Sequence, residues 1–293
     1  MWTPKYVPEN QMTHKSHFVS VFYLKQFLIK NEHLLAAYNC FNNKFYRSKP
    51  ENLCFENDAY ETIWGEDQMN RLGKYLLTND IENYFAQREI IYSQLQKRLI
   101  NICMNPKNNK ALVCSADDKT LLCEWVLNFL VRHPCRLKEI GKISNYNFSE
   151  ISPDVIELFK LLGFGSPDAI FKHVTKRAYL TSLITNGPFQ QMQEELRNMN
   201  CVFCISNATR FITSSMPVAL IEGPHVYFPI SPYLVVIFTP LSATQRINRS
   251  NRILNMTQHV NEMNNFYVDI VKQIDVNLKI IGSTESDLDA FRS

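Results

Sequence analysis

Apolar positions in the middle of the chain recur at steps of three and four residues, which is the period of an α-helix. This pattern predicts a helix over residues 79–101, and it returns over residues 118–140. Pro134 lies inside the second segment, where its missing N–H and its ring should kink or end the helix just before Arg132. Further helices are expected at 153–163 and within 167–199.

The N-terminal part combines a helix with strands. Ser16 is a suitable helix cap, and residues 17–28 are apolar around most of the circumference, which predicts a largely buried helix. Residues 33–38 and 44–47 flank an asparagine-rich turn and predict a β-hairpin. A third short segment, 53–61, leads into the helical middle.

The C-terminal part changes to short, proline-punctuated, strand-like runs from Cys201 onwards. A helix near 254–273 and a strand over 276–281 complete the pattern. Strands at both ends of a helical middle predict the α+β class: a single helix-rich domain over 14–282, whose mixed or antiparallel sheet combines the N-terminal hairpin with C-terminal strands. An N-terminal extension, 1–13, and a short acidic tail, 283–293, flank it.

Composition narrows the function classes without naming one. The 31 Lys+Arg and 28 Asp+Glu leave a net charge of +3, which demands neither nucleic acid nor lipid as a partner. Only 8 glycines in 293 residues disfavour the nucleotide-binding folds that need glycine where backbone approaches a ligand. The first ten residues lack the pattern of a secretory signal, and no apolar run approaches the roughly 20 residues of a membrane span. We therefore expect a soluble, cytoplasmic protein without membrane contact.

Eight cysteines, mostly in apolar segments, indicate reduced core thiols rather than disulfides. Cys201 and Cys204 have the spacing of a zinc or redox motif, but they lie in a run typical of a buried strand. Residues three apart in a strand point to opposite faces, so the two sulfurs are not expected to share a metal ion.

Several blocks in order resemble a large, mostly bacterial family identified as domain of unknown function 4238. His17-Phe18-Val19 with Phe22-Tyr23-Leu24 and Phe27 is similar to the family's opening pattern H-[YF]-V-P-x-x-Y-L-x-x-F. The further matching blocks, which extend the resemblance from about residue 14 to 281, are Glu56–Tyr60, Ile81-Glu82 with Glu89, Phe129–Arg136, Phe211–Val218, Phe228–Pro232 and Val260–Asn264.

The resemblance implies a shared fold without an established activity. Similar proteins look like accessory genes of mobile elements and defence islands, which suggests a toxin or anti-phage effector. Two departures matter: Ser20 stands where the family usually has proline, and Ser215 stands where it has an acidic residue. The second departure removes a carboxylate that a metal site or general base would use. If that carboxylate is catalytic, this chain is either impaired or works differently from its relatives.

Candidate catalytic residues come from these blocks. His14 and His17 place two imidazoles at a predicted helix start, as a metal half-site or a general base, or alternatively as locally bonded and solvated histidines. Arg132, four residues before Arg136, is a candidate phosphate clamp; the alternative is a buried ion pair with Glu82 or Glu89.

Three acidic residues are candidate metal or proton partners. Glu82 and Glu89 lie seven apart on one helix face, about 10.5 Å along the axis, too far to hold one ion directly. Helix capping is the alternative for Glu82, and a solvated or paired helix face is the alternative for Glu89. Asp58 is the third candidate. Thr213-Ser214-Ser215 follows a predicted strand, and a turn that bonds backbone is its simpler role.

Two basic segments are candidate nucleic-acid contacts, with solvated loops as the alternative. Their residues are Arg246, Arg249 and Arg252 in one segment and Lys176 and Arg177 in the other.

The leading hypothesis is a bacterial defence or toxin-type effector that acts on nucleic acid, for example as a nuclease, with His17 as base, Arg132 as clamp and Glu82, Glu89 and Asp58 as metal or proton partners. No motif identifies a cofactor, although a divalent metal ion suits these residue types. The alternative is a non-catalytic regulatory protein that binds another protein, such as one encoded in the same operon. A third hypothesis is a small-molecule enzyme with a closed polar pocket.

Overall fold

A computed structural model describes most of the chain, and its contacts divide the chain into two compact units. The described residues are 15–57, 59–60, 80–105, 113–140, 152–161, 175, 178–180, 189–221, 225–240, 252–275 and 277–291. The first unit comprises Met1–Ser16, Phe55–Arg88 and Pro134–Gln190, and the second comprises His17–Cys54, Glu89–His133 and Gln191–Ser293.

The first unit is described through a few elements. They are the start of α4 (Asp80–Cys103), β4 (Phe55–Asn57), α6 (Pro134–Ile140) and α7 (Pro153–Leu161). Its apolar cluster contains Tyr60, Ile81, Phe85 and Leu180, and the rings of Tyr60 and Phe85 meet edge to face with centroids 5.1 Å apart. The strand β1 (Lys15–His17), which pairs with β4, ends where the second unit begins.

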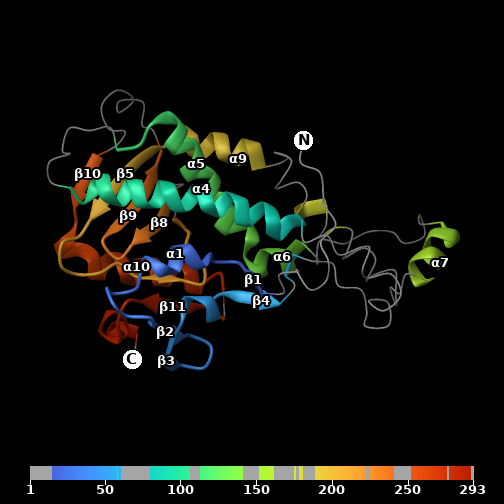
Figure 1. Cartoon of the computed structure of the whole chain (residues 1–293), viewed down its shortest axis with the longest axis horizontal. Helices are drawn as coiled ribbons and strands as arrows, with labels where there is room; N and C mark the ends of the chain where they lie inside the picture. The colour runs from blue at the N-terminus through green and yellow to red at the C-terminus, as the bar shows by residue number, and fades with distance from the viewer. Residues whose placement is uncertain are drawn as a thin grey trace. The chain divides into compact units, whose positions relative to one another are not determined.

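The second unit contains a five-stranded sheet in the order β10-β5-β9-β8-β7. Figure 1 labels β10, β5, β9 and β8 of this sheet. The strands are β5 (Asn200–Ile205), β7 (Ala219–Ile221), β8 (His225–Ser231), β9 (Leu234–Thr239) and β10 (Arg252–Asn255). Neighbours pair antiparallel except β10, which runs parallel to β5. This sheet is therefore mixed.

A four-stranded sheet in the same unit, in the order β3-β2-β11-β6, joins both ends of the chain. Its strands are β2 (Leu35–Asn39), β3 (Lys44–Ser48), β6 (Thr213–Ser214) and β11 (Lys279–Gly282), and all of them pair antiparallel. Asn43, in the turn of the hairpin, has a φ of 54°, a conformation that asparagine tolerates better than most residues. The expected α+β class, and a sheet that combines the N-terminal hairpin with C-terminal strands, are confirmed.

Helices cover both faces of the five-stranded sheet. On one face, α4 and α5 (Ala116–Arg132) pack Leu95, Leu99 and Trp125 against strand residues such as Phe203 and Phe228. On the other face, α10 (Val260–Lys272) contributes apolar residues that pack against β5, β8, β9 and the four-stranded sheet. The two cores explain the strand pattern, because successive residues of β5, β8 and β9 enter opposite layers.

Cys201 and Cys204 illustrate this alternation. Both lie in β5 and are 2% exposed, but Cys201 belongs to the core under α4 and α5, whereas Cys204 belongs to the core under α10. The prediction that these sulfurs point to opposite faces is confirmed. All eight cysteines are free thiols.

The helix break at Pro134 is also confirmed. The helix α5 begins with a capping box between Ser115 and Asp118 and ends at Arg132, and Pro134 opens α6. His133 between them is extended, with φ −63° and ψ 135°, which is the backbone region imposed on a residue that precedes proline.

The prediction of one helix over residues 17–28 is wrong. Residues 15–17 form β1, and α1 spans only Val21–Lys25, with Ser20 rather than Ser16 at its N-terminus. The backbone amides of Phe18 and Val19 donate to the carbonyl of Cys54, at 3.0 and 3.4 Å. This contact holds the segment before Ser20 extended, which local periodicity does not reveal.

The C-terminal predictions need two adjustments. The expected helix near 254–273 begins later, because residues 252–255 form β10 and the α-helix starts at Val260. The acidic segment after β11 forms a 3-10 helix, η7 (Glu285–Phe291), which buries Leu288 and Phe291. In the part of the chain that the structure describes, no helix has the length and apolarity needed to span a bilayer.

Candidate functional site: a polar pocket and a buried polar network

A buried ion pair joins Arg132, at the end of α5, to Glu89 in α4. The Arg132 Nη1 lies 2.9 Å from the Glu89 Oε1, and the two side chains are 2% and 24% exposed. The Ser20 hydroxyl donates to the same carboxylate oxygen at 2.6 Å, and the other terminal nitrogen of Arg132 donates to the backbone carbonyl of His17. This network fastens the N-terminal segment to two helices.

The structure brings His17 and Arg132 together, but through the His17 backbone. The His17 imidazole instead has its Nε2 3.2 Å from the Glu51 carbonyl oxygen. The alternative of a buried Arg132–Glu89 ion pair is therefore present, and a guanidinium that is 2% exposed does not face solvent where a phosphate could reach it. The catalytic roles of His17, Arg132 and Glu89 stay predictions.

Of the remaining predicted residues, Glu82 and Arg252 lie within the described part of the chain. Glu82 is half-buried near the start of α4, in the first unit. Arg252 lies in β10, opposite Val202 of β5, and its side chain is not described. Asp58, Lys176, Arg177, Arg246 and Arg249 lie outside the described residues. The predicted nucleic-acid contact stays a prediction for this reason.

The Thr213–Ser215 block forms backbone and hydroxyl contacts within the core. The Ser214 hydroxyl lies 2.7 Å from both the Tyr267 hydroxyl and the Met216 carbonyl oxygen. The Ser215 hydroxyl accepts a hydrogen bond of 3.0 Å from the backbone amide of Lys279. The simpler, turn-forming role agrees with these bonds, and Ser215 bonds Lys279 of β11 through its hydroxyl and its backbone amide.

A second buried pair was not predicted. The His133 Nε2 lies 3.5 Å from the Asp275 Oδ2, and the side chains are 3% and 6% exposed. Phe18 meets the His133 ring edge on, with centroids 5.3 Å apart, and the Asp275 Oδ1 accepts a 2.9 Å bond from the backbone amide of Asn277. His133 and Asp275 are 142 residues apart, so no spacing rule links them; the only sequence signal was the block around Arg132.

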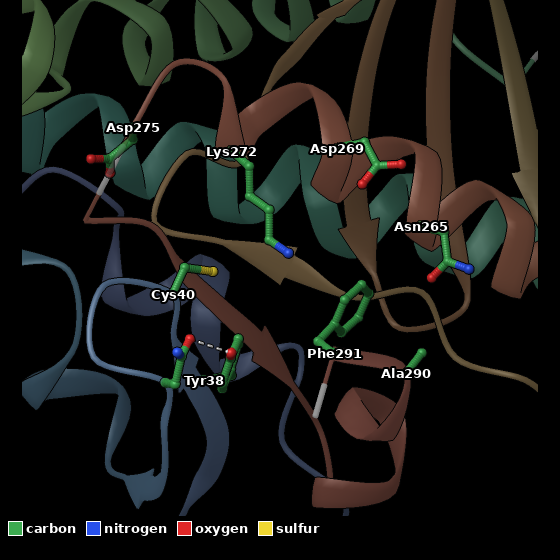
Figure 2. A pocket seen from close by; sticks show the side chains of 9 residues that line it. Tyr38, Cys40, Asn265, Asp269, Lys272, Asp275, Ala290 and Phe291 are labelled. Carbon is green, nitrogen blue, oxygen red and sulfur yellow. Dashed lines mark hydrogen bonds between the residues drawn. The ribbon is translucent and has the colours of Figure 1, made fainter. Parts of the chain in front are cut away.

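Asp275 also lines a pocket of about 650 Å³ in the second unit, shown in Figure 2. Three segments far apart in the sequence form its walls: the end of β2 with the hairpin turn, α10 with the residues that follow it, and the end of η7. The lining residues are Tyr38, Cys40, Asn43, Asn265, Asp269, Lys272, Asp275, Ala290 and Phe291.

The helix α10 supplies most of the polar wall. Asn265, Asp269 and Lys272 follow each other at four and three residues, which places them on one helix face. In Figure 2 the Lys272 side chain extends from α10 towards the space between Cys40 and Phe291. The Lys272 ammonium lies 5.8 Å from the centroid of the Phe291 ring, within the range of a cation–π contact.

The opposite wall comes from the hairpin. The Tyr38 hydroxyl donates to the Asn43 Oδ1 at 2.7 Å, which orients the amide of Asn43. Burial raises the pKa of the Cys40 thiol above its usual range, against the opposing effect of Lys272 and with a further increase from Asp275. The thiol is therefore protonated at neutral pH and is a weak hydrogen-bond donor rather than a nucleophile.

Charge and shape together make this pocket the best candidate site among the described residues. Its lining contains one ammonium, two carboxylates, of which that of Asp275 is buried, two amides and two aromatic rings, and its volume falls in the range of small-molecule sites. His133 and Asp275 additionally offer ligand types that divalent metals use, although dependence on a metal stays a prediction. No sequence motif marked the pocket, because its walls come from three segments that are far apart in the sequence.

Comparison with known proteins identifies a family. The family model described as "Protein of unknown function (DUF4238)" matches residues 15–270. No curated protein and no solved structure matches the chain.

Proposed function

Since this chain belongs to the DUF4238 family, whose description names no activity, its function must follow from its own residues, and we propose that it binds a small polar molecule in the pocket beside α10. The third sequence hypothesis was a small-molecule enzyme with a closed polar pocket, and we keep from it only the binding of a small molecule in a polar pocket.

One observation carries the proposal: polar side chains converge on the pocket without satisfying one another. Among the described residues, Asn265 and Asp269 have no side-chain hydrogen bond or ion pair, and the Lys272 ammonium has no carboxylate within 4.0 Å. By contrast, Arg132, Ser20 and Glu89 bond to each other, and Arg132 and Ser20 are buried while Glu89 is 24% exposed. Polar groups that line a cavity without internal partners are available to a ligand.

The rear of the pocket supports the same proposal. Asp275 is 5% exposed and is held on one oxygen by the Asn277 amide and close to His133 on the other. The Asp275 carboxylate is therefore already ordered before a ligand binds, so binding does not carry the entropic cost of ordering it. The exposed residues of α10 are in turn carried by a helix that buries Tyr267, Val268 and Val271.

A thermal-shift screen of the purified full chain tests the proposal. The probes are the twenty amino acids, four ribonucleoside monophosphates, glucose 6-phosphate and putrescine. At a hundredfold excess over its Kd a ligand stabilises the folded state by about 2.7 kcal/mol, which raises the Tm by roughly 5–10 °C. We expect at least one probe to do so, and a failure of every probe would reject the proposal.

Variants then locate the binding. We expect Lys272→Met and Asp269→Asn each to reduce the shift given by the bound probe. Lys97→Met on the exposed face of α4 and Glu194→Gln on α9 (Phe189–Arg197) are matched controls, because both side chains are exposed and neither lines the pocket. A shift that survives both pocket substitutions would place the ligand elsewhere.

A further inference from the structure

The pocket is lined by two oppositely charged side chains of α10, Asp269 and Lys272, that do not form an ion pair with each other. Asp269 and Lys272 are three residues apart on α10, a spacing at which oppositely charged side chains commonly pair. Here Lys272 instead turns towards the Phe291 ring, 5.8 Å from its centroid, and no ion pair forms between the two residues (Figure 2). The Lys272 ammonium and the Asp269 carboxylate thus both line the same pocket.

We infer that the ligand carries an amino-acid head group, an ammonium next to a carboxylate, bound between Asp269 and Lys272. This inference rests on the proposed function. The ligand's carboxylate contacts the Lys272 ammonium, and its ammonium contacts the Asp269 carboxylate and the Asn265 amide oxygen, one turn earlier on the helix.

The charge balance disfavours ligands with a single sign of charge. Asp269 and Asp275 outnumber Lys272, and the pocket lies at the C-terminal half of α10, where the helix dipole is negative; both features disfavour a simple anion such as a sugar phosphate. A simple cation would meet the unneutralised Lys272 ammonium. A zwitterion satisfies both positions at once.

The hairpin wall adds polarity that suits the carboxylate end. The Asn43 Oδ1 is already occupied by the Tyr38 hydroxyl, which leaves the Asn43 N–H groups as donors in the lining of the pocket. Ala290 and Phe291 supply apolar surface in the same pocket. Because about 650 Å³ exceeds the size of the head group alone, we assign this remaining space to an apolar or aromatic side chain.

Three probes with the same ring separate the charges: L-phenylalanine, 2-phenylethylamine, which lacks the carboxylate, and 3-phenylpropionate, which lacks the ammonium. Isothermal titration calorimetry on the full chain should give a Kd for L-phenylalanine at least tenfold lower than for either single-charge probe. Equal affinity for the three probes, or tighter binding of a single-charge probe, overturns the inference.

Substitutions assign each end of the ligand. Lys272→Met should weaken L-phenylalanine at least tenfold and leave 2-phenylethylamine unchanged or tighter. Asp269→Asn should weaken L-phenylalanine to a similar extent and leave 3-phenylpropionate unchanged or tighter. The controls Lys97→Met and Glu194→Gln should bind like the native chain, and circular dichroism checks that all variants fold.

The outcome also separates this inference from the proposed function. If no amino acid binds but another probe binds and loses affinity in the pocket variants, the binding function stands and the zwitterion assignment is rejected. If no probe binds at all, both are rejected.

Discussion

Replacing Glu89 with glutamine measures what the ion pair with Arg132 contributes to stability. The substitution keeps the size of the side chain and one hydrogen-bond acceptor for Ser20, but it removes the negative charge 2.9 Å from a guanidinium that is 2% exposed. The Arg132 side chain keeps its bond to the His17 carbonyl. The change therefore isolates the charge interaction.

The expected loss follows from burial. Two unit charges 2.9 Å apart attract each other by about 6 kcal/mol at an effective dielectric constant of about 20. Glu89 is 24% exposed, so water screens part of this attraction, and the amide retains a neutral hydrogen bond. We expect a loss of about 3 kcal/mol in the free energy of unfolding, at the lower end for broken buried pairs.

Equilibrium unfolding in urea gives this free energy, and a thermal melt gives an independent value. A loss of about 3 kcal/mol corresponds to a decrease in Tm of roughly 6–12 °C. The control is Glu32→Gln, because Glu32 and Arg47 form an ion pair of similar length, 3.0 Å, with side chains that are 49% and 44% exposed. Exposed pairs contribute about 0.2–1 kcal/mol, so the control should shift the Tm by only a few degrees.

Equal losses in the two variants would refute this reasoning, because they would show that burial of Arg132 does not strengthen its pairing. A loss below about 1 kcal/mol in Glu89→Gln would do the same. An unchanged m-value in urea is needed for the comparison, since a changed slope would mean that the substitution altered the surface exposed on unfolding.

Two further predictions concern the buried tyrosines. Burial raises the pKa of Tyr23, Tyr227 and Tyr267 above that of an exposed tyrosine, so their stabilising effect is complete below about pH 10 and is lost as pH rises above it. Each pH unit above 10 should lower the free energy of unfolding by about 1.4 kcal/mol per tyrosine. Phenolate absorbance should therefore appear together with unfolding, and phenolate that forms in the folded protein would contradict this prediction. Tyr227→Phe should leave the stability in urea unchanged or raised, because no described residue bonds the buried Tyr227 hydroxyl. Tyr267→Phe should lose about 1–2 kcal/mol, because it removes the hydrogen bonds to Met216 and Ser214. A larger loss in Tyr227→Phe than in Tyr267→Phe would contradict the hydrogen-bond assignment.

Features with a local cause were predictable from the sequence. The period of three and four residues identified α4, the asparagines identified the hairpin turn, and Pro134 identified the end of α5. The alternation of a strand placed Cys201 and Cys204 on opposite faces. The rule that a buried arginine needs a partner gave Glu89 as one of two alternatives for Arg132.

Features caused by contacts between distant segments were not predictable from the sequence. The segment before Ser20 is extended because its amides bond the carbonyl of Cys54, and residues 252–255 become a strand because β5 lies beside them. The His17 imidazole was a candidate base, but the tertiary structure uses the His17 carbonyl as the contact to Arg132.

The sequence by itself determined the central helices, the hairpin, the opposite faces of β5 and the family resemblance that the family model confirms over residues 15–270. Only the tertiary structure decided which polar residues meet. The pocket joins the hairpin turn, α10 and η7, and the His133–Asp275 pair joins residues 142 positions apart. The physical reason is that periodicity records which side of an element faces the core, whereas a site depends on which elements the core brings together.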